Sequence, residues 1–151
     1  MRIYVVRHGE AEGMVSTDAE RRLTVPGRQQ VLDIWRALRD QGVRPTTLVS
    51  SPYVRARQTA TAIAEVFPEL QPVIRPELTP DGSTGRVLSW LGDLPTLEGL
   101  VLVSHMPLVS LLTADLTDGA HTTFPVACVA CIDLEVVARH AGRLLWLKSA
   151  I

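Results

Sequence analysis

The chain has 151 residues, 46% of them hydrophobic, and a formal net charge of −1 at pH 7. This length and composition predict a single domain, residues 1–151, with a substantial core, and they exclude an intrinsically disordered chain. The near-neutral charge and the lack of an apolar run of ~18 to 20 residues argue against a protein that binds nucleic acid or membranes, so we expect a cytoplasmic protein. No long apolar surface is evident in the sequence, so we expect a monomer.

The first predicted element is a buried strand near the amino terminus. The apolar run 3–6 leads directly into Arg7-His8-Gly9, and a polar, charged loop follows over residues 10–22. Apolar residues then recur at helical spacing. A helix is therefore predicted to begin after Thr24, its expected N-cap, and to end at Gly42.

Strands and helices alternate over most of the remaining chain. The predicted strands are 47–51, 73–74 and 100–104, and the predicted helices are 53–67, 85–94 and 108–116. The last two apolar segments, 126–134 and 143–148, flank a turn and predict an antiparallel hairpin. The expected fold class is therefore α/β, a three-layer α/β/α sandwich with a mostly parallel sheet and a C-terminal antiparallel hairpin.

The two cysteines, Cys128 and Cys131, form a C-x-x-C sequence inside a predicted strand. Three residues along a strand span ~10 Å, and the two side chains point to opposite faces. A disulfide requires Cα atoms within about 7 Å of each other. We therefore interpret both cysteines as small core or sheet residues, and not as a redox or zinc motif.

Polar residues follow three of the predicted strands. Arg7 and His8 follow the first strand, Arg55 lies shortly after the second, and His105 follows the strand 100–104. Ligands of open α/β sheets bind at the carboxyl ends of the strands. Taken singly, each arginine could form a surface ion pair and each histidine could be a hydrogen-bonded core residue. Gly9 could simply allow a tight turn. Two arginines and two histidines at three strand ends together favour a phosphate site.

Four blocks of sequence carry a family resemblance: Arg7-His8-Gly9, Leu23-Thr24-x-x-Gly27, Ser51-Pro52-x-x-Arg55-Ala56-x-Gln58-Thr59 and Ser104-His105-x-Pro107. In this order they resemble the histidine phosphatase superfamily. Within it, the short chain, Arg21 before Leu23-Thr24, and the stretches 76–80 and 104–109 are similar to the SixA-type protein phosphohistidine phosphatases. The first block alone is a weak match, whereas four in order are specific, and the resemblance spans nearly the whole chain.

The resemblance implies a role for each of these side chains. His8 would attack phosphorus and form a phosphohistidine intermediate, and nearby arginine cations would keep its imidazole neutral. Its other ring nitrogen is expected to donate to a backbone carbonyl next to Gly9. Arg7 and Arg55 would clamp the phosphoryl oxygens, and His105 would donate a hydrogen bond to one of them. Arg21 and Gly9 are further expected substrate contacts.

The leaving group decides whether a general acid is needed. Ester hydrolysis expels an alkoxide that wants a proton, and Glu77 is the candidate acid, with a structural role such as capping the next helix as the alternative. A phosphoramidate expels imidazole and tolerates a weak acid. The segment 10–16 also lacks the Asn of mutase-like members, and the chain is too short for helical insertions over the pocket. We therefore predict phosphohistidine on a protein, such as a histidine-containing phosphotransfer domain, as the substrate.

Three alternatives remain at this point. The chain could be a broad small-molecule phosphomonoesterase, or a non-catalytic module that binds phosphate or a phosphoprotein. A metal site built from His8, His105, Glu10 and Glu12 is the third. The two flanking arginines would oppose a bound dication, so the interpretation requires neither a metal nor a cofactor.

Overall fold

The protein is described by a computed structural model that covers residues 1–14 and 16–150. Its sheet has six strands in the order β3-β2-β4-β1-β5-β6. The strands are β1 (Arg2–Arg7), β2 (Thr47–Ser50), β3 (Val73–Ile74), β4 (Leu100–Ser104), β5 (Val129–Asp133) and β6 (Arg143–Lys148). The first four run parallel, whereas β5 is antiparallel to β1 and β6 is antiparallel to β5. The predicted mostly parallel sheet with a C-terminal hairpin is confirmed.

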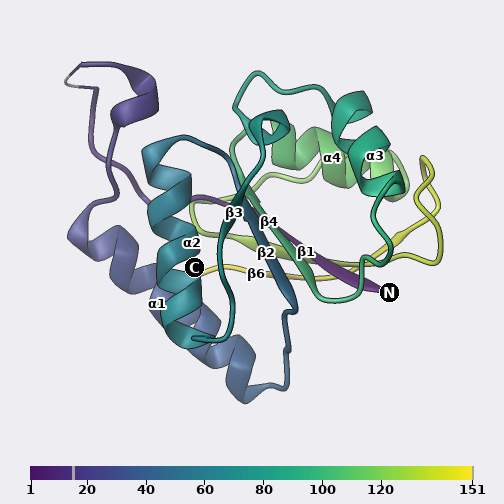
Figure 1. The fold of residues 1–151 in the computed structure, drawn as a ribbon, viewed down its shortest axis with the longest axis horizontal. Coiled ribbons are helices and arrows are strands. Elements are labelled where there is room, and N and C mark those ends of the chain that lie inside the picture. The colour runs from purple at the N-terminus through teal and green to yellow at the C-terminus, as the bar shows by residue number, and fades with distance from the viewer. Residues whose placement is uncertain (15, 151) are drawn as a thin grey trace.

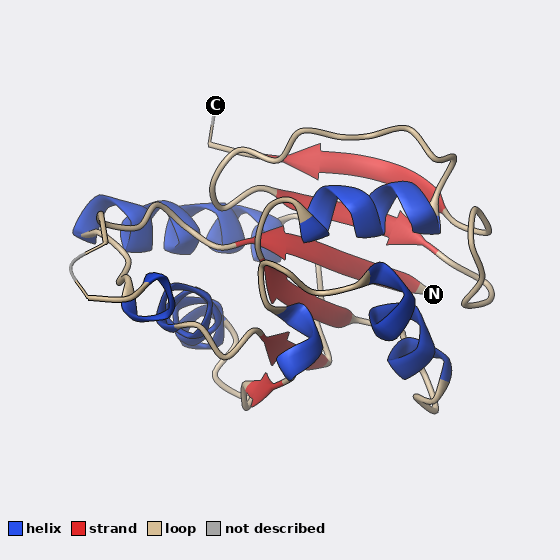
Figure 2. Ribbon diagram, turned by 90° about the horizontal axis from the view of Figure 1, so that it is seen from above, coloured by secondary structure: helices blue, strands red, loops and turns tan. Residues whose placement is uncertain are grey.

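Helices cover both faces of this sheet (Figures 1 and 2). Helices α1 (Val25–Asp40) and α2 (Val54–Val66) pack on one face, and α3 (Thr84–Gly92) and α4 (Leu108–Leu116) pack on the other. Two short 3-10 helices, η1 (Asp18–Glu20) and η2 (Pro76–Leu78), lie in the connections. The three-layer sandwich predicted from the alternation of apolar runs is confirmed. None of the described helices is long and apolar enough to cross a bilayer.

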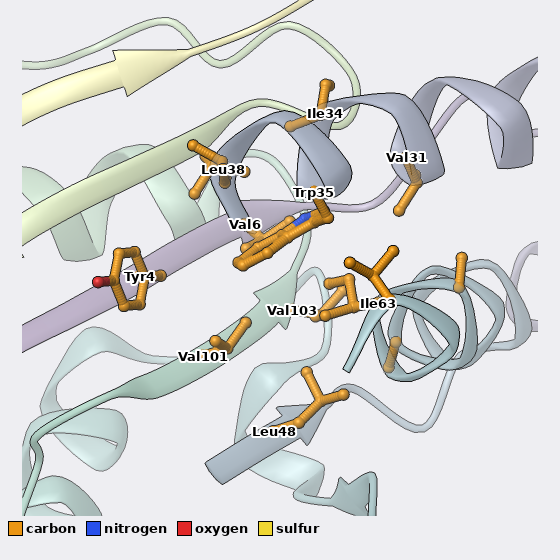
Figure 3. Packing of buried hydrophobic residues seen from close by; sticks show 14 of the residues in the cluster. Tyr4, Val6, Val31, Ile34, Trp35, Leu38, Leu48, Ile63, Val101 and Val103 are labelled. Carbon is orange, nitrogen blue, oxygen red and sulfur yellow. The ribbon is translucent and has the colours of Figure 1, made fainter. Parts of the chain in front are cut away.

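Strand β1 shows why the central strands are continuous apolar runs. Tyr4 and Val6 belong to the core under α1 and α2, while Ile3 and Val5 belong to the core under α3 and α4. Figure 3 shows the first of these cores, in which Trp35 of α1 lies over the sheet near Val6. Because both faces are buried, alternation with polar residues would place polar groups in a core. The strand end is the first position where a polar side chain is tolerated.

The start of α1 lies beside the end of β1. The hydroxyl of Thr24 accepts a hydrogen bond from the Gly27 amide at 2.9 Å, which confirms the predicted N-cap. The same hydroxyl donates to the Glu10 carboxylate at 2.8 Å. The helix ends at Asp40, two residues before Gly42, whose φ of +96° suits a glycine at the following turn. This cap holds the chain after β1 against the helix that begins there.

The two cysteines lie on opposite sides of the sheet. Both are free and buried, Cys128 in the core under α3 and α4 and Cys131 in the core under α1 and α2. This confirms their interpretation as core residues. The predicted strand 126–134 begins too early, because β5 starts at Val129. Ala127 has a φ of +64°, which interrupts extended backbone, and its amide donates to the His8 carbonyl.

Candidate active site

Three strand ends meet where the sequence predicts the site. Arg7 pairs with Ser104 in the register of β1 and β4, and the His8 amide donates to the Ser104 carbonyl at 3.0 Å. The imidazoles of His8 and His105 therefore lie side by side, with ring centroids 5.1 Å apart. Ser51, just after β2, donates its amide to the Val103 carbonyl of β4. The parallel register of three neighbouring strands thus places these residues at one sheet edge.

The ring of His8 is held in one orientation. It is 6% exposed, and its Nδ1 lies 2.7 Å from the carbonyl oxygen of Gly9. Because a carbonyl only accepts, Nδ1 carries the hydrogen and Nε2 keeps its lone pair. Burial, together with the positive charges of Arg55 and Arg7, lowers the pKa of His8 to about 4, against the opposing effect of the Gly9 bond. The imidazole is therefore neutral at neutral pH, with a lone pair on Nε2.

Gly9 is packed too tightly for a side chain. A Cβ there would lie 3.0 Å from the Val31 side chain and 3.2 Å from the Gly27 carbonyl, at the junction of β1 with α1. Its amide donates to the Thr59 hydroxyl at 3.0 Å. The predicted substrate-contact residue thus directs its amide into the protein, and its close approach to α1 accounts for a glycine.

Arg55 connects His8 to the loop before α1. It projects from the first turn of α2, its side chain is 5% exposed, and its Nε–H lies 3.2 Å from His8 Nε2, the atom with the lone pair. Its Nη1 donates to the Asp18 carbonyl at 2.6 Å, and its Nη2 donates to the Asp18 carboxylate at 3.1 Å. All three guanidinium nitrogens therefore have partners in the protein.

Arg7 approaches the site from β1. Its Nη1 donates to the Phe124 carbonyl at 2.8 Å, and its Nε is buried with no partner among the described residues. Burial and the neighbouring Arg55 charge lower the pKa of Arg7. A buried donor without a protein partner is a group that an oxyanion can satisfy.

His105 carries a second buried nitrogen without a protein partner. The residue is 1% exposed, Nε2 lies 2.7 Å from the Ser51 hydroxyl, and Nδ1 has no partner among the described residues. The Ser51 oxygen accepts from the Tyr53 amide, and the Ser51 hydroxyl hydrogen can be donated to His105 Nε2. In that arrangement Nδ1 carries a hydrogen and is a free donor. Burial and the nearby His8 lower the pKa of His105 to about 3, so the ring is neutral.

The loop before α1 contributes Asp18, which the sequence analysis does not single out. Its carboxylate accepts from Arg55 Nη2 and, at 3.0 Å, from Arg21 Nη1. Arg21 also donates to the Glu12 carbonyl at 2.8 Å. Hydrogen bonds from Arg21 and then Arg55 lower the pKa of the Asp18 carboxyl, so it is ionised at neutral pH. The available sequence signal is weak, an acid three residues before Arg21 in a polar loop.

Glu77 lies apart from these groups. Its carboxylate pairs with the Arg75 guanidinium, in a hollow lined also by Arg86 and Trp90. Within residues 1–14 and 16–150, no carboxyl other than that of Asp18 hydrogen-bonds to Arg7, His8, Arg55 or His105. The suggested cap role of Glu77 is wrong, because α3 has Ser83 as its N-cap.

The metal alternative finds no support in the described part of the chain. No group of three or more histidine, cysteine or acidic side chains there could hold a metal ion. The Glu10 carboxylate accepts from Thr24 instead of facing His8. The arrangement is that of an anion site, with arginine donors around a neutral imidazole.

Comparison with known proteins places this chain among phosphatases. A model of the histidine phosphatase superfamily, branch 1, matches residues 3–80. Phosphohistidine phosphatase SixA of Escherichia coli strain K12 is 33% identical, over 89% of this chain and 86% of that protein. A SixA homolog of Haemophilus influenzae is 34% identical, over 98% of this chain and 100% of its own. The structure of the protein histidine phosphatase SixA complexed with tungstate has a TM-score of 0.90 and 29% identity, covering 99% of this chain and 97% of that one.

Proposed function

The chain belongs to the histidine phosphatase superfamily and is a hydrolase of the histidine phosphatase type, and we propose that it removes the phosphoryl group from phosphohistidine on a protein. The substrate class we propose is a histidine-containing phosphotransfer domain. The relatives named phosphohistidine phosphatases support phosphohistidine as the group that is hydrolysed. The tungstate complex of a similar protein supports binding of a tetrahedral oxyanion.

The single observation that carries the proposal is the state of His8. It is buried and neutral, and the Gly9 carbonyl holds the tautomer that leaves the lone pair on Nε2. In the proposed reaction His8 Nε2 forms a bond to phosphorus while the P–N bond of a phosphohistidine that is protonated on its other ring nitrogen breaks, so that neutral imidazole leaves. Water then attacks phosphorus, the Nε2–P bond breaks, and the protons of the water stay on the released inorganic phosphate or pass to solvent, which restores the neutral histidine.

Arg55 must change partners before this attack. Its Nε–H lies on the His8 lone pair, so a phosphoryl oxygen has to take over this hydrogen bond for Nε2 to reach phosphorus. Arg7 contributes its unpartnered Nε, and His105 contributes its Nδ1 hydrogen, to the oxygens of the transferring group. Arg21 would approach the same oxygens from the loop before α1, beside Arg55.

The protonation states favour phosphohistidine over a phosphate ester. An alkoxide leaving group needs an acid, but Asp18 is ionised and paired with arginines, and His105 is neutral with a pKa of about 3. The Glu77 carboxylate is paired with Arg75. Imidazole is a far better leaving group than an alkoxide and departs without a strong acid. The substrate that this set of groups suits best is therefore a phosphoramidate.

The test is phosphate release, in EDTA, from a phosphohistidine-bearing phosphotransfer domain, with a phosphate ester assayed alongside. We expect release from phosphohistidine to exceed release from the ester, and His8→Ala to lower it at least about a thousandfold. His121→Ala, which changes an exposed histidine, is the matched control and retains full activity. Faster ester turnover would identify a small-molecule phosphomonoesterase. Release from neither substrate, with no radiolabelled phosphate trapped on His8, would identify a binding module.

A further inference from the structure

Asp18 occupies the donors that a phosphoryl group would use. Its carboxylate lies between two arginines of the site, 3.0 Å from Arg21 Nη1 and 3.1 Å from Arg55 Nη2. Its backbone carbonyl accepts from Arg55 Nη1 at 2.6 Å. With Nε on His8, the Arg55 guanidinium has a protein acceptor on each of its three nitrogens. An incoming oxyanion therefore meets arginines that an acidic residue of the same chain already binds.

The two partners differ in how easily they can move. The Arg55 side chain is 5% exposed, whereas the Asp18 side chain is 41% exposed. Asp18 also belongs to a three-residue 3-10 helix, while Arg55 belongs to the 13-residue helix α2. A half-exposed carboxylate can return to water at little cost, whereas a buried guanidinium must keep a partner. When an oxyanion arrives, Asp18 is the group that yields.

We propose that Asp18 is an affinity-determining residue, an internal counter-anion that holds Arg55 and Arg21 in the empty site and weakens the binding of inorganic phosphate. This inference rests on the proposed function, in which the same arginines bind the phosphoryl group. Asp18 acts through the two arginines, because its carboxylate competes for their N–H groups and repels a nearby dianion. Free phosphate, the product, is held weakly and leaves.

The competition also distinguishes the substrate from the product. Inorganic phosphate has only the contacts of the phosphoryl site with which to displace Asp18. A phosphoryl group attached to a protein brings further contacts from that protein, so it can displace the carboxylate at a concentration where free phosphate does not. Asp18 thereby favours a protein-bound phosphoryl group over the phosphate that the reaction releases.

The decisive variant is Asp18→Asn, which keeps the shape, an acceptor oxygen and the backbone carbonyl but removes the charge. Calorimetric titration of the full chain with inorganic phosphate should show binding at least about fivefold tighter than in the wild type. With the phosphohistidine domain as substrate, KM should fall while kcat does not rise, because phosphate leaves more slowly. A residue that only supports the loop would leave phosphate affinity unchanged or weaken it.

Glu20→Gln is the matched control. Glu20 lies on the same 3-10 helix and is exposed, and its carboxylate accepts from the Ser16 hydroxyl, not from an arginine. The substitution removes one negative charge from the same turn, and we expect phosphate affinity to stay within about twofold of the wild type. Equal tightening in both variants would overturn the proposal, since it would show a long-range charge effect without competition for the arginines.

Other outcomes also overturn the proposal. Phosphate affinity in Asp18→Asn equal to or weaker than that of the wild type would show that the carboxylate only positions the arginines. No phosphate binding by either protein would show that the arginines are not an anion site. These titrations involve no turnover. A failure of the proposed phosphohistidine hydrolysis therefore stays distinguishable from a failure of this inference.

Discussion

The inner and outer parts of the site are held in different ways. The inner part, His8 and His105, lies at buried strand ends, where the Gly9 carbonyl fixes the hydrogen on the His8 ring and the Ser51 hydroxyl hydrogen-bonds to the His105 ring. The outer part, Asp18 and Arg21, lies on a polar loop and is held by charged side chains exposed to water. Strand ends thus supply His8, the proposed nucleophile, in a protonation state that does not change near neutral pH. Ion pairs that water can reach form the part that, in our proposal, an anion displaces.

Arg55 contacts both His8 of the inner part and Asp18 of the outer part, so we expect its substitution to have the largest effect on activity. We expect Arg55→Ala to lower kcat/KM for phosphohistidine at least about a hundredfold, because one preorganised donor to an oxyanion is worth about 10²–10³ in rate. Arg55→Lys should recover little, since an ammonium cannot replace the planar fork. The control is Arg57→Ala, an exposed arginine on the same helix, assayed for phosphate release. More than half of the activity remaining in Arg55→Ala would contradict this role.

Removing the Ser51 hydroxyl tests how the inner part is set. In Ser51→Ala, His105 Nε2 loses its partner, so the ring is free to move its hydrogen from Nδ1 to Nε2. We expect kcat to fall about tenfold, because His105 Nδ1 would no longer always carry the hydrogen that it donates to a phosphoryl oxygen, with a smaller change in KM. Nitrogen-15 NMR of His105 reports which ring nitrogen is protonated. An unchanged Nδ1–H tautomer in the variant would contradict the assignment of this hydrogen bond.

Acid pH tests the inner part, because it protonates the imidazole of His8. The pKa of about 4 for His8 predicts activity that is constant near neutral pH and falls as pH drops through about 4, where the imidazolium has no lone pair. An activity midpoint near pH 6.5 would show that burial does not depress this pKa. Stability also falls as pH drops from 6.5 to 4. In this range the unfolded histidine, with a pKa of about 6.5, binds more protons than the folded one.

The size of this stability loss follows from the His8 shift. The free energy of unfolding should fall over that window by a contribution on the order of 3 kcal/mol from His8. Chemical denaturation at several pH values measures it, and His8→Asn, which cannot titrate, should show a shallower slope than the wild type. Equal slopes in the two proteins would show that other groups account for the acid sensitivity.

Glu77 belongs to neither part, and its substitution should have the smallest effect. We expect Glu77→Gln to change phosphohistidine turnover by less than about twofold, because the Glu77 carboxylate pairs with Arg75 and, among the described residues, hydrogen-bonds to none of Arg7, His8, Arg55 and His105. Steady-state assays with a phosphohistidine domain and with an ester measure this. A hundredfold loss with the ester, with phosphohistidine unaffected, would make Glu77 a general acid and the protein an esterase.

The strand ends and the residues that follow them could be predicted from the sequence. Strands buried on both faces are continuous apolar runs, so the change to Arg7-His8 and to Ser104-His105 marks where β1 and β4 leave the core. The Thr24 cap has an equally local signature, because a capping side chain bonds to an amide three residues away. These features depend on residues that are close in the sequence, so the sequence alone is enough to predict them.

Only the tertiary structure decided which side chains face each other across long separations. Asp18 meets Arg55, 37 residues away, and Ser51 meets His105, 54 residues away. Neither pair has a periodic or local signal, because each depends on how a loop folds over a helix or how two strands lie in register. Even the pairing of Glu77 with Arg75, two residues apart, depends on side-chain directions around η2. The sequence by itself determined the sandwich and the kind of groups at its strand ends. Packing decided which donors are buried without a partner and which carboxylate holds the arginines.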